Sequence, residues 1–260
     1  MKRIISSLIL SLTMLCAEGQ SLYVGSFYVT SPEEEALLGD GGDKWAKRRP
    51  VICDMFKYEQ PDVLGLQGLT ASQLTSLKSG TSYLTAENIL YNRALALDTC
   101  GVASDMPEGT SCSWARLRKE DKPFYVINFS FSTSTSTAFS AAVRLRAFID
   151  ELNAEDLPCV VVGYLGVSET KTAYTRLAAR FNDCYKKAPV VSAEYGTVNN
   201  FDLAANHGAD RLDYVFVSRD FTIKAYGQLQ YGYFTQESDG TYKRRLPSAH
   251  FPVMAKVTLP

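Results

Sequence analysis

Histidine and aspartate side chains are the first candidates for chemistry in this chain of 260 residues. Its only two histidines are His207 and His250, and Asp202, Asp210 and Asp213 lie between or beside them in the sequence. A histidine can move a proton during attack on an ester, and a carboxylate behind it fixes its tautomer and supports its charge. Two histidines are too few for a centre that needs several imidazole ligands or bases.

Cysteine is the second reactive side chain, and five of the six cysteines follow the N-terminal segment. They are Cys53, Cys100, Cys112, Cys159 and Cys184. An odd number leaves at least one thiol unpaired unless chains cross-link. Cys100 and Cys112 flank a turn-rich stretch, and a disulfide between them would contribute about 3 kcal/mol. The pairing stays open, and because no two cysteines have the spacing of a zinc site, we expect no zinc.

The N-terminal residues have the pattern of a secretory signal peptide. Lys2 and Arg3 precede a 12-residue apolar stretch, and Ala17-Glu18-Gly19 resembles a cleavage pattern of small residues. Twelve residues are too few to span a bilayer, and no later segment is apolar enough to do so. We therefore expect removal of residues 1–19 and export to the periplasm or the exterior. A lipoprotein anchor through Cys16 is the alternative.

Composition and charge exclude several classes of protein. Lysine and arginine number 27 and aspartate and glutamate 28, so the formal charge is −1. This balance argues against binding of nucleic acid by bulk electrostatics, which requires a basic domain or stripe. A content of 46% hydrophobic and 21% charged residues excludes a disordered chain. No linker or repeat divides residues 20–260, which we expect to form a single domain.

Hydrophobic periodicity predicts strands and helices in alternation. Strands are expected at residues 22–29, 63–67, 89–91, 94–99, 113–118, 124–131, 159–162, 212–217, 221–229 and 253–259. Helices are expected between 43 and 58, near 73–80 and at 138–152, where the apolar spacing is most regular. The pattern predicts an α/β domain with two packed sheets and helices outside them.

A series of short motifs resembles the endonuclease/exonuclease/phosphatase family. They are Trp45 with Arg48-Arg49-Pro50, Pro61-Asp-Val-Leu-Gly-Leu-Gln67, Ile89-Leu-Tyr-Asn-Arg93, residues 99–101, Ser113-Trp-Ala-Arg-Leu117, Phe124-Tyr-Val-Ile-Asn128, Gly196-Thr197 with Phe201, Arg211-Leu-Asp-Tyr-Val-Phe-Val217 and Ser248-Ala-His-Phe-Pro-Val253. Each motif is weak alone, but they follow the family's order. The resemblance implies a four-layer α/β sandwich of the DNase I-like type. It also implies a cleft for Mg²⁺ or Mn²⁺ and hydrolysis of phosphodiester or phosphomonoester bonds.

The family's metal-binding positions carry other residues in this sequence. Tyr28 stands where the resemblance implies an asparagine, and Gly68 stands in place of a metal-ligand glutamate. The family's Gly-Asp-Phe-Asn run is Gly163-Tyr164-Leu165-Gly166 here, so Tyr164 and Gly166 replace its aspartate and asparagine. Since Mg²⁺ does not readily exchange its water for neutral groups, we expect no metal and no cofactor. The rings of Tyr28 and Tyr164 are expected to fill the space.

The family's catalytic positions are also altered. Ser130 replaces a histidine, and Ala249 replaces the aspartate of a Ser-Asp-His run. On this comparison Ala249 leaves His250 without its carboxylate. The family residues that remain are His250, Asp213 and Asn128. Because so many groups are replaced, we predict a protein that keeps the scaffold without catalysis and uses the altered cleft, or another face, for binding.

Two other functions stay open. An active, divalent-metal-dependent phosphodiesterase or phosphatase could use a rearranged site near His207, with Asp202, Asp210 or Asp213 as its carboxylates and Mg²⁺ or Mn²⁺ as its cofactor. An anion-binding module could instead hold a phosphate- or sulfate-bearing ligand. Its candidate binding residues are Arg93, Asn128 and His250. A protein partner is also compatible with the sequence, which identifies neither ligand nor partner.

Overall fold

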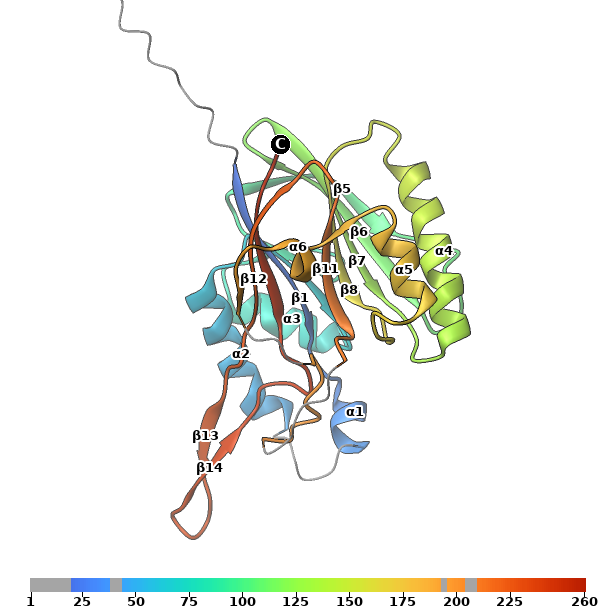
Figure 1. Cartoon of the computed structure of the whole chain (residues 1–260). Helices are drawn as coiled ribbons and strands as arrows, with labels where there is room; N and C mark the ends of the chain where they lie inside the picture. The colour runs from blue at the N-terminus through green and yellow to red at the C-terminus, as the bar shows by residue number, and fades with distance from the viewer. Residues whose placement is uncertain (1–19, 38–43, 193–195, 204–209) are drawn as a thin grey trace, which may run out of the picture.

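Two β-sheets pack face to face, with helices on both outer faces, in the computed structural model of the chain (Figure 1). The structure describes residues 20–37, 44–192, 196–203 and 210–260. The expected signal peptide, Cys16 and His207 lie outside these residues. Within the described ranges, no helix has both the length and the apolar character needed to cross a membrane.

The two large sheets contain most of the strands in the described residues. The first sheet has the strand order β10-β12-β15-β1-β2-β4-β3 and the second β5-β6-β7-β8-β11-β9. The first is built from β1 (Ser21–Tyr28), β2 (Val63–Gln67), β3 (Leu84–Ala86), β4 (Ile89–Tyr91), β10 (Val191–Ser192), β12 (Thr222–Gln228) and β15 (Val253–Thr258). The second is built from β5 (Leu95–Val102), β6 (Ser111–Lys119), β7 (Lys122–Ser130), β8 (Cys159–Tyr164), β9 (Asn182–Asp183) and β11 (Asp213–Val217).

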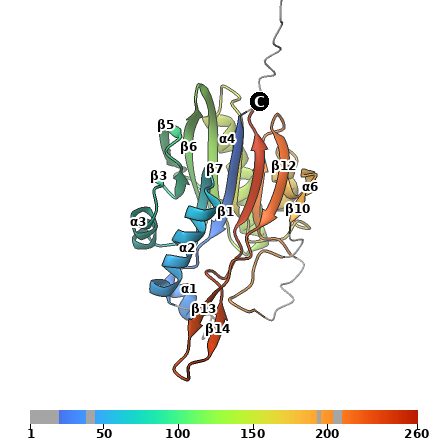
Figure 2. The ribbon, with the colours of Figure 1, turned by 90° about the vertical axis from the view of Figure 1, so that its left-hand side faces the viewer.

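The helices lie outside the sheets, and a hairpin projects beyond the sheets (Figure 1, Figure 2). The helices are α1 (Pro32–Leu37), α2 (Trp45–Glu59), α3 (Ala71–Gly80), α4 (Thr135–Leu152), α5 (Thr172–Ala178) and α6 (Cys184–Lys187). Strands β13 (Tyr233–Gln236) and β14 (Tyr242–Arg245) form the hairpin. Ser134 caps α4, accepting a hydrogen bond from the backbone N–H of Thr137.

Three hydrophobic layers hold this arrangement together. Valines such as Val24 and Val160 fill the space between the sheets. Ile52 and Leu64 belong to the layer between the first sheet and α2, and Ile149 belongs to the layer between the second sheet and α4. Burial of apolar side chains on both faces of each sheet explains the nearly continuous apolar runs of the central strands. The prediction of a four-layer α/β sandwich is confirmed.

The elements expected from periodicity are present, including the short β4, and several other short elements were missed. The observed β1, β2, β7, β8, β11 and β15 agree with their predicted ranges to within one or two residues. Helices α1 and α5 and the β13–β14 hairpin were not predicted. Helix α1 has no buried residue, so it lacks the apolar spacing on which such a prediction depends.

The pairing of Cys100 with Cys112, which the sequence left open, is not formed in the structure. Cys100 faces the layer between the sheets, whereas Cys112 belongs to the layer under α4. Cys100 on β5 and Cys112 on the neighbouring β6 therefore point to opposite faces of the second sheet. A disulfide cannot bridge the two faces of a sheet. All five cysteines of the described residues are free thiols.

Arg48 on α2 is a fully buried cation that joins segments far apart in the sequence. Its guanidinium donates hydrogen bonds to the carbonyl oxygens of Val29, Thr30 and Pro247, at 2.8–3.0 Å. It also pairs with the Glu35 carboxylate on α1 at 2.7 Å. A buried charge is tolerated when it is paired and its donors are satisfied. Arg48 therefore fixes the end of β1, helix α1 and the loop that leads to His250.

Replacing Arg48 by methionine should lower the free energy of unfolding by about 3–5 kcal/mol, because Glu35 would lose its partner and three carbonyls their donor. Urea unfolding followed by circular dichroism measures this loss. Arg93→Met is the matched control, since Arg93 is exposed and donates to a single carbonyl, that of Ser82. Equal losses in the two variants would contradict the anchoring role of Arg48.

Thiol labelling of the folded chain from Gln20 onward should modify Cys100 first. Cys100 is half-buried, whereas the other four cysteines are at most 3% exposed. Burial also raises the pKa of Cys112 and that of Cys159 to about 12, which removes the reactive thiolate near pH 8. A maleimide titration followed by mass spectrometry should lose its fast phase in Cys100→Ser and keep it in Cys53→Ser. A fast phase that survives Cys100→Ser would refute this assignment.

Candidate functional site

The polar residues singled out in the sequence gather at one end of the layer between the sheets. Along β1, Leu22 and Val24 face this layer, and the same face of the strand continues to Tyr28. In the same way, β2 ends with Gln67, β7 with Asn128 and Ser130, and β8 with Tyr164. Asp213 opens the antiparallel β11 directly opposite Tyr164. Each strand therefore changes from apolar to polar at the same edge.

A buried amide pair joins the two sheets at this edge. The Gln67 side-chain amide donates to Oδ1 of Asn128 at 2.6 Å, and Gln67 Oε1 accepts from Ser26 Oγ at 3.1 Å. Asn128 Nδ2 donates to the carbonyls of Leu66 and Asn88, at 3.0 and 3.1 Å. The donors and acceptors of the pair are thus used within the protein. Asn128 serves here as a structural link between sheets.

The ring of Tyr28 occupies the centre of the predicted cleft. It stacks on His250, with ring centroids 4.3 Å apart and planes 19° apart, and meets Tyr164 edge-on at 4.9 Å. Its hydroxyl donates to the carboxylate of Glu34 on α1. Burial raises the pKa of Tyr164 to about 12, with a further contribution from the charge of Asp213. The expectation that the two tyrosines fill this space is confirmed.

Gly68 and Tyr28 fit one another sterically. Gly68 has a φ angle of +57°, and a Cβ atom there would lie 2.2 Å from a ring carbon of Tyr28. The tyrosine ring therefore stands in the space that any side chain at position 68 would enter. Gly166 has a φ of +73°, and a Cβ there would approach the Ser132 carbonyl oxygen to 2.4 Å. Neither position accepts a larger side chain without movement of its neighbours.

His250 has a carboxylate partner, so the expectation that Ala249 leaves it unsupported is wrong. Its Nδ1 lies 2.8 Å from Oδ2 of Asp213. The same oxygen accepts a hydrogen bond from Thr197 Oγ1 at 2.5 Å. Asp213 is 1% exposed, and its Oδ1 has no hydrogen-bond partner in the described chain. The supporting carboxylate comes from β11 and not from the residue next to His250, which sequence adjacency could not reveal.

Ala249 belongs instead to a small apolar cluster with Phe201, Leu246 and Phe251. Its backbone N–H donates to Thr30 Oγ1 at 3.1 Å, and its carbonyl accepts from the backbone of Asn199. This packing holds the loop in which His250 lies.

Three other sequence candidates are not part of this centre. Arg93 follows β4 at the opposite end of the first sheet. There the side-chain amide of the preceding Asn92 donates a hydrogen bond to Asp62, just before β2 begins. The expected group of Arg93, Asn128 and His250 is therefore not brought together. Asp202 and Asp210 are exposed, and Asp213 pairs with His250. His207 cannot be placed, because it lies outside the described residues.

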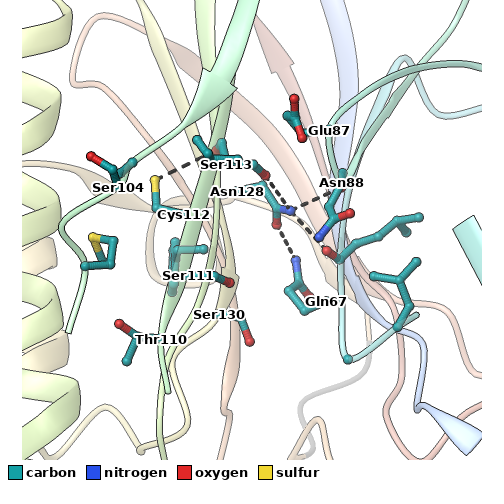
Figure 3. Close-up of a pocket in the computed structure, with 17 residues that line it drawn as sticks. Gln67, Glu87, Asn88, Ser104, Thr110, Ser111, Cys112, Ser113, Asn128 and Ser130 are labelled. Carbon is teal, nitrogen blue, oxygen red and sulfur yellow. Dashed lines mark hydrogen bonds between the residues drawn. The ribbon is translucent and has the colours of Figure 1, made fainter. Parts of the chain in front are cut away.

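A pocket of about 350 Å³ opens beside the tyrosines (Figure 3). It lies between the end of β2, the start of β4 and the edge formed by β5, β6 and β7. Its polar lining is made of hydroxyl and amide side chains, among them Ser111, Ser130 and Asn88. Gly68 forms part of the lining, whereas Tyr28 and His250 are outside it. Sequence reasoning missed this pocket because half of its lining comes from turns.

The donor set at this edge does not suit a divalent metal ion of the kind that the family resemblance implies. Magnesium binds carboxylate oxygens and water in preference to neutral groups. The groups here are tyrosine rings, serine hydroxyls and hydrogen-bonded amides, together with the carboxylates of Glu34 and Asp213, which contact Tyr28 and His250. Among the residues that the structure describes, no three His, Cys, Asp or Glu side chains are grouped as metal ligands would be.

Two residues that sequence reasoning did not assign take part in the centre. Glu34, in an unpredicted helix, holds the Tyr28 hydroxyl, and Thr197 holds Asp213. Thr197 belongs to the Gly196-Thr197 motif, so that motif was the signal for it. Glu34 offers no comparable signal, because its contact depends on how α1 folds back on β1.

Comparison with known proteins identifies structural relatives of the whole described domain. No family sequence model matches the chain, and no curated protein matches it in sequence. An endonuclease/exonuclease/phosphatase family protein from Bacteroides thetaiotaomicron is similar, with a TM-score of 0.82 and 25% identity over 93% of this chain and 99% of that one. A mannosyl-6-phosphatase from the same organism has a TM-score of 0.81 and 25% identity over 92% of this chain and 100% of that one.

More distant proteins share the fold. The catalytic domain of human nocturnin, with a bound sulfate, has a TM-score of 0.65 and 14% identity, covering 92% of this chain and 94% of that one. The two mixed sheets with flanking helices, and the order of the sequence motifs along them, agree with the resemblance stated above. The chain therefore has the fold of the endonuclease/exonuclease/phosphatase family, and a structural relative of 25% identity belongs to that family.

Proposed function

We propose that this protein is an exported, non-catalytic member of the family that binds a ligand away from the tyrosine-filled centre, in the open pocket beside Gly68. The observation that carries the proposal is the packing of Tyr28 against Gly68 and His250. A ring in this position takes the space that a side chain at position 68 and a metal with its water would need. Position 68 supplies no carboxylate, and the carboxylates of Glu34 and Asp213 are paired with Tyr28 and His250, which supports binding in place of metal-assisted hydrolysis.

The surroundings of His250 support the same proposal. Its side chain is 9% exposed, stacked beneath Tyr28 and against the edge of Tyr164. A general acid or base must come within hydrogen-bond reach of the proton that it transfers. The two tyrosines restrict the approach of an ester to this imidazole. Export is supported by the sequence pattern of residues 1–19 alone.

A second candidate function is favoured by the contact between His250 and Asp213. An imidazole with a buried carboxylate at 2.8 Å is the arrangement that holds one tautomer and supports its charge. One structural relative is a mannosyl-6-phosphatase, so an active phosphatase acting on a sugar phosphate is the alternative. It would require Tyr28 to leave its place and a metal site to form from other groups.

The purified protein with Mg²⁺ or Mn²⁺ should show no turnover of nitrophenyl phosphate esters, DNA or a sugar 6-phosphate above a protein-free blank. Colorimetric phosphate release and gel analysis of DNA measure this. The control is His250→Ala, which should be equally inactive. Metal-dependent turnover in the wild type that both His250→Ala and Asp213→Asn abolish would establish the active phosphatase and refute our proposal.

A double-mutant cycle tests the steric contact between Tyr28 and Gly68. Gly68→Ala should lower the free energy of unfolding by about 2–4 kcal/mol, because it adds backbone strain at positive φ and overlap with the ring. In a Tyr28→Asn background the same change should cost only about 1 kcal/mol, since the ring is gone. Guanidinium unfolding measures both values.

Gly109→Ala is the matched control for this cycle. Gly109 has a φ of +73°, and a Cβ there would meet nothing within 4 Å. Its replacement should therefore cost the same with or without Tyr28. If Gly68→Ala behaves like Gly109→Ala in both backgrounds, Tyr28 does not occupy the space above position 68.

A further inference from the structure

The pocket next to the tyrosines has no basic side chain in its described lining (Figure 3). Its one charged group is Glu87, a carboxylate at its rim. A phosphate or sulfate in this pocket would meet a like charge and no cation. The lining therefore selects against the anionic ligands that the sequence had suggested.

The polar groups of the pocket form two sets. The first, which we call the floor, is hydrogen-bonded within the protein, and the second, which we call the rim, is available to a ligand. On the floor, Gln67 and Asn128 bond to each other and to backbone carbonyls, which holds them in place. On the rim, the hydroxyls of Ser111 and Ser130 form no hydrogen bond within the described part of the chain. Hydroxyls can both donate and accept, so the rim can pair with ligand groups of either kind.

Apolar side chains complete the lining. Leu69, Val102 and Met106 face the same volume, and Val102 is 61% exposed. At about 350 Å³ the pocket lies near the lower end of the range of small-molecule sites. A ligand that fits it is small and uncharged, with hydroxyl groups on its edge and C–H groups on its face.

We infer that this pocket binds a neutral polyhydroxylated ligand of the size of a monosaccharide ring. Its hydroxyls pair with Glu87, Asn88 and the rim serines, and its C–H face packs on the apolar wall. A carboxylate that accepts hydrogen bonds from hydroxyls makes the stronger, charge-assisted kind. The inference rests on the binding role proposed above and names the ligand class for it.

Calorimetric titration of the protein tests this with D-glucose, D-mannose, D-galactose, N-acetyl-D-glucosamine and myo-inositol as neutral probes. Glucose 6-phosphate, mannose 6-phosphate and inorganic phosphate are the anionic probes. We expect saturable binding of at least one neutral probe with a Kd of about a millimolar or below, and weaker binding of every anionic probe. Binding of none of the neutral probes, or tighter binding of an anionic one, would overturn the inference.

Variants locate the binding. Glu87→Gln should weaken binding of the neutral probe about tenfold, because a charge-assisted bond becomes an ordinary one. Glu108→Gln makes the same change on an exposed residue outside the lining and should have no effect. Ser111→Trp should fill the pocket and abolish binding while the melting temperature stays near that of the wild type. Equal affinities of Glu87→Gln and Glu108→Gln would overturn the inference even if Ser111→Trp fails to fold.

Failure of this inference is distinguishable from failure of the proposed function. The titrations report binding with no metal present, whereas the turnover assays report hydrolysis. Metal-dependent turnover that depends on His250 would refute the non-catalytic role. It would not affect the conclusion about sugar binding, because the titrations measure binding separately. Absence of both turnover and sugar binding overturns the inference and leaves the non-catalytic role in place.

Discussion

The buried guanidinium of Arg48 is the contact on which the geometry of the cleft depends. It joins the carbonyls after β1, the carboxylate of α1 and the loop that precedes His250. Removal of a charge from water is costly, and this cost is offset only when its partners are all in place. The positions of Tyr28, Glu34 and His250 are therefore coupled, since each lies within a few residues of a group that Arg48 holds. The Arg48-Arg49-Pro50 motif thus has a structural explanation.

The two sides of Gly68 differ in how their space is used. On one side, Tyr28 and Tyr164 close over His250, and Gly68 provides the space that the Tyr28 ring needs. On the other side, the pocket beyond Gly68 is open and lined with hydroxyls and amides. The aromatic rings and neutral polar groups of this region pack and hydrogen-bond among themselves.

Local sequence predicted much of the fold because apolar spacing and motif order are local properties. Prediction failed where contacts depend on packing between distant segments. His250 finds its carboxylate in Asp213, 37 residues away in the sequence. Arg93 was misassigned for the same reason, since strand direction decides at which end of a sheet a side chain lies.

The sequence by itself determined most of the strand and helix pattern and the order of the motifs that resemble the endonuclease/exonuclease/phosphatase family. These depend on residue identity and on short-range order, which the chain carries without folding. The tertiary structure alone decided that Tyr28 stacks on His250, that Asp213 supports His250, and that a pocket without basic side chains in its described lining lies beside them. Such contacts arise from the register and packing of strands that are distant in sequence, and a shift of one residue would turn each of these side chains to the opposite face.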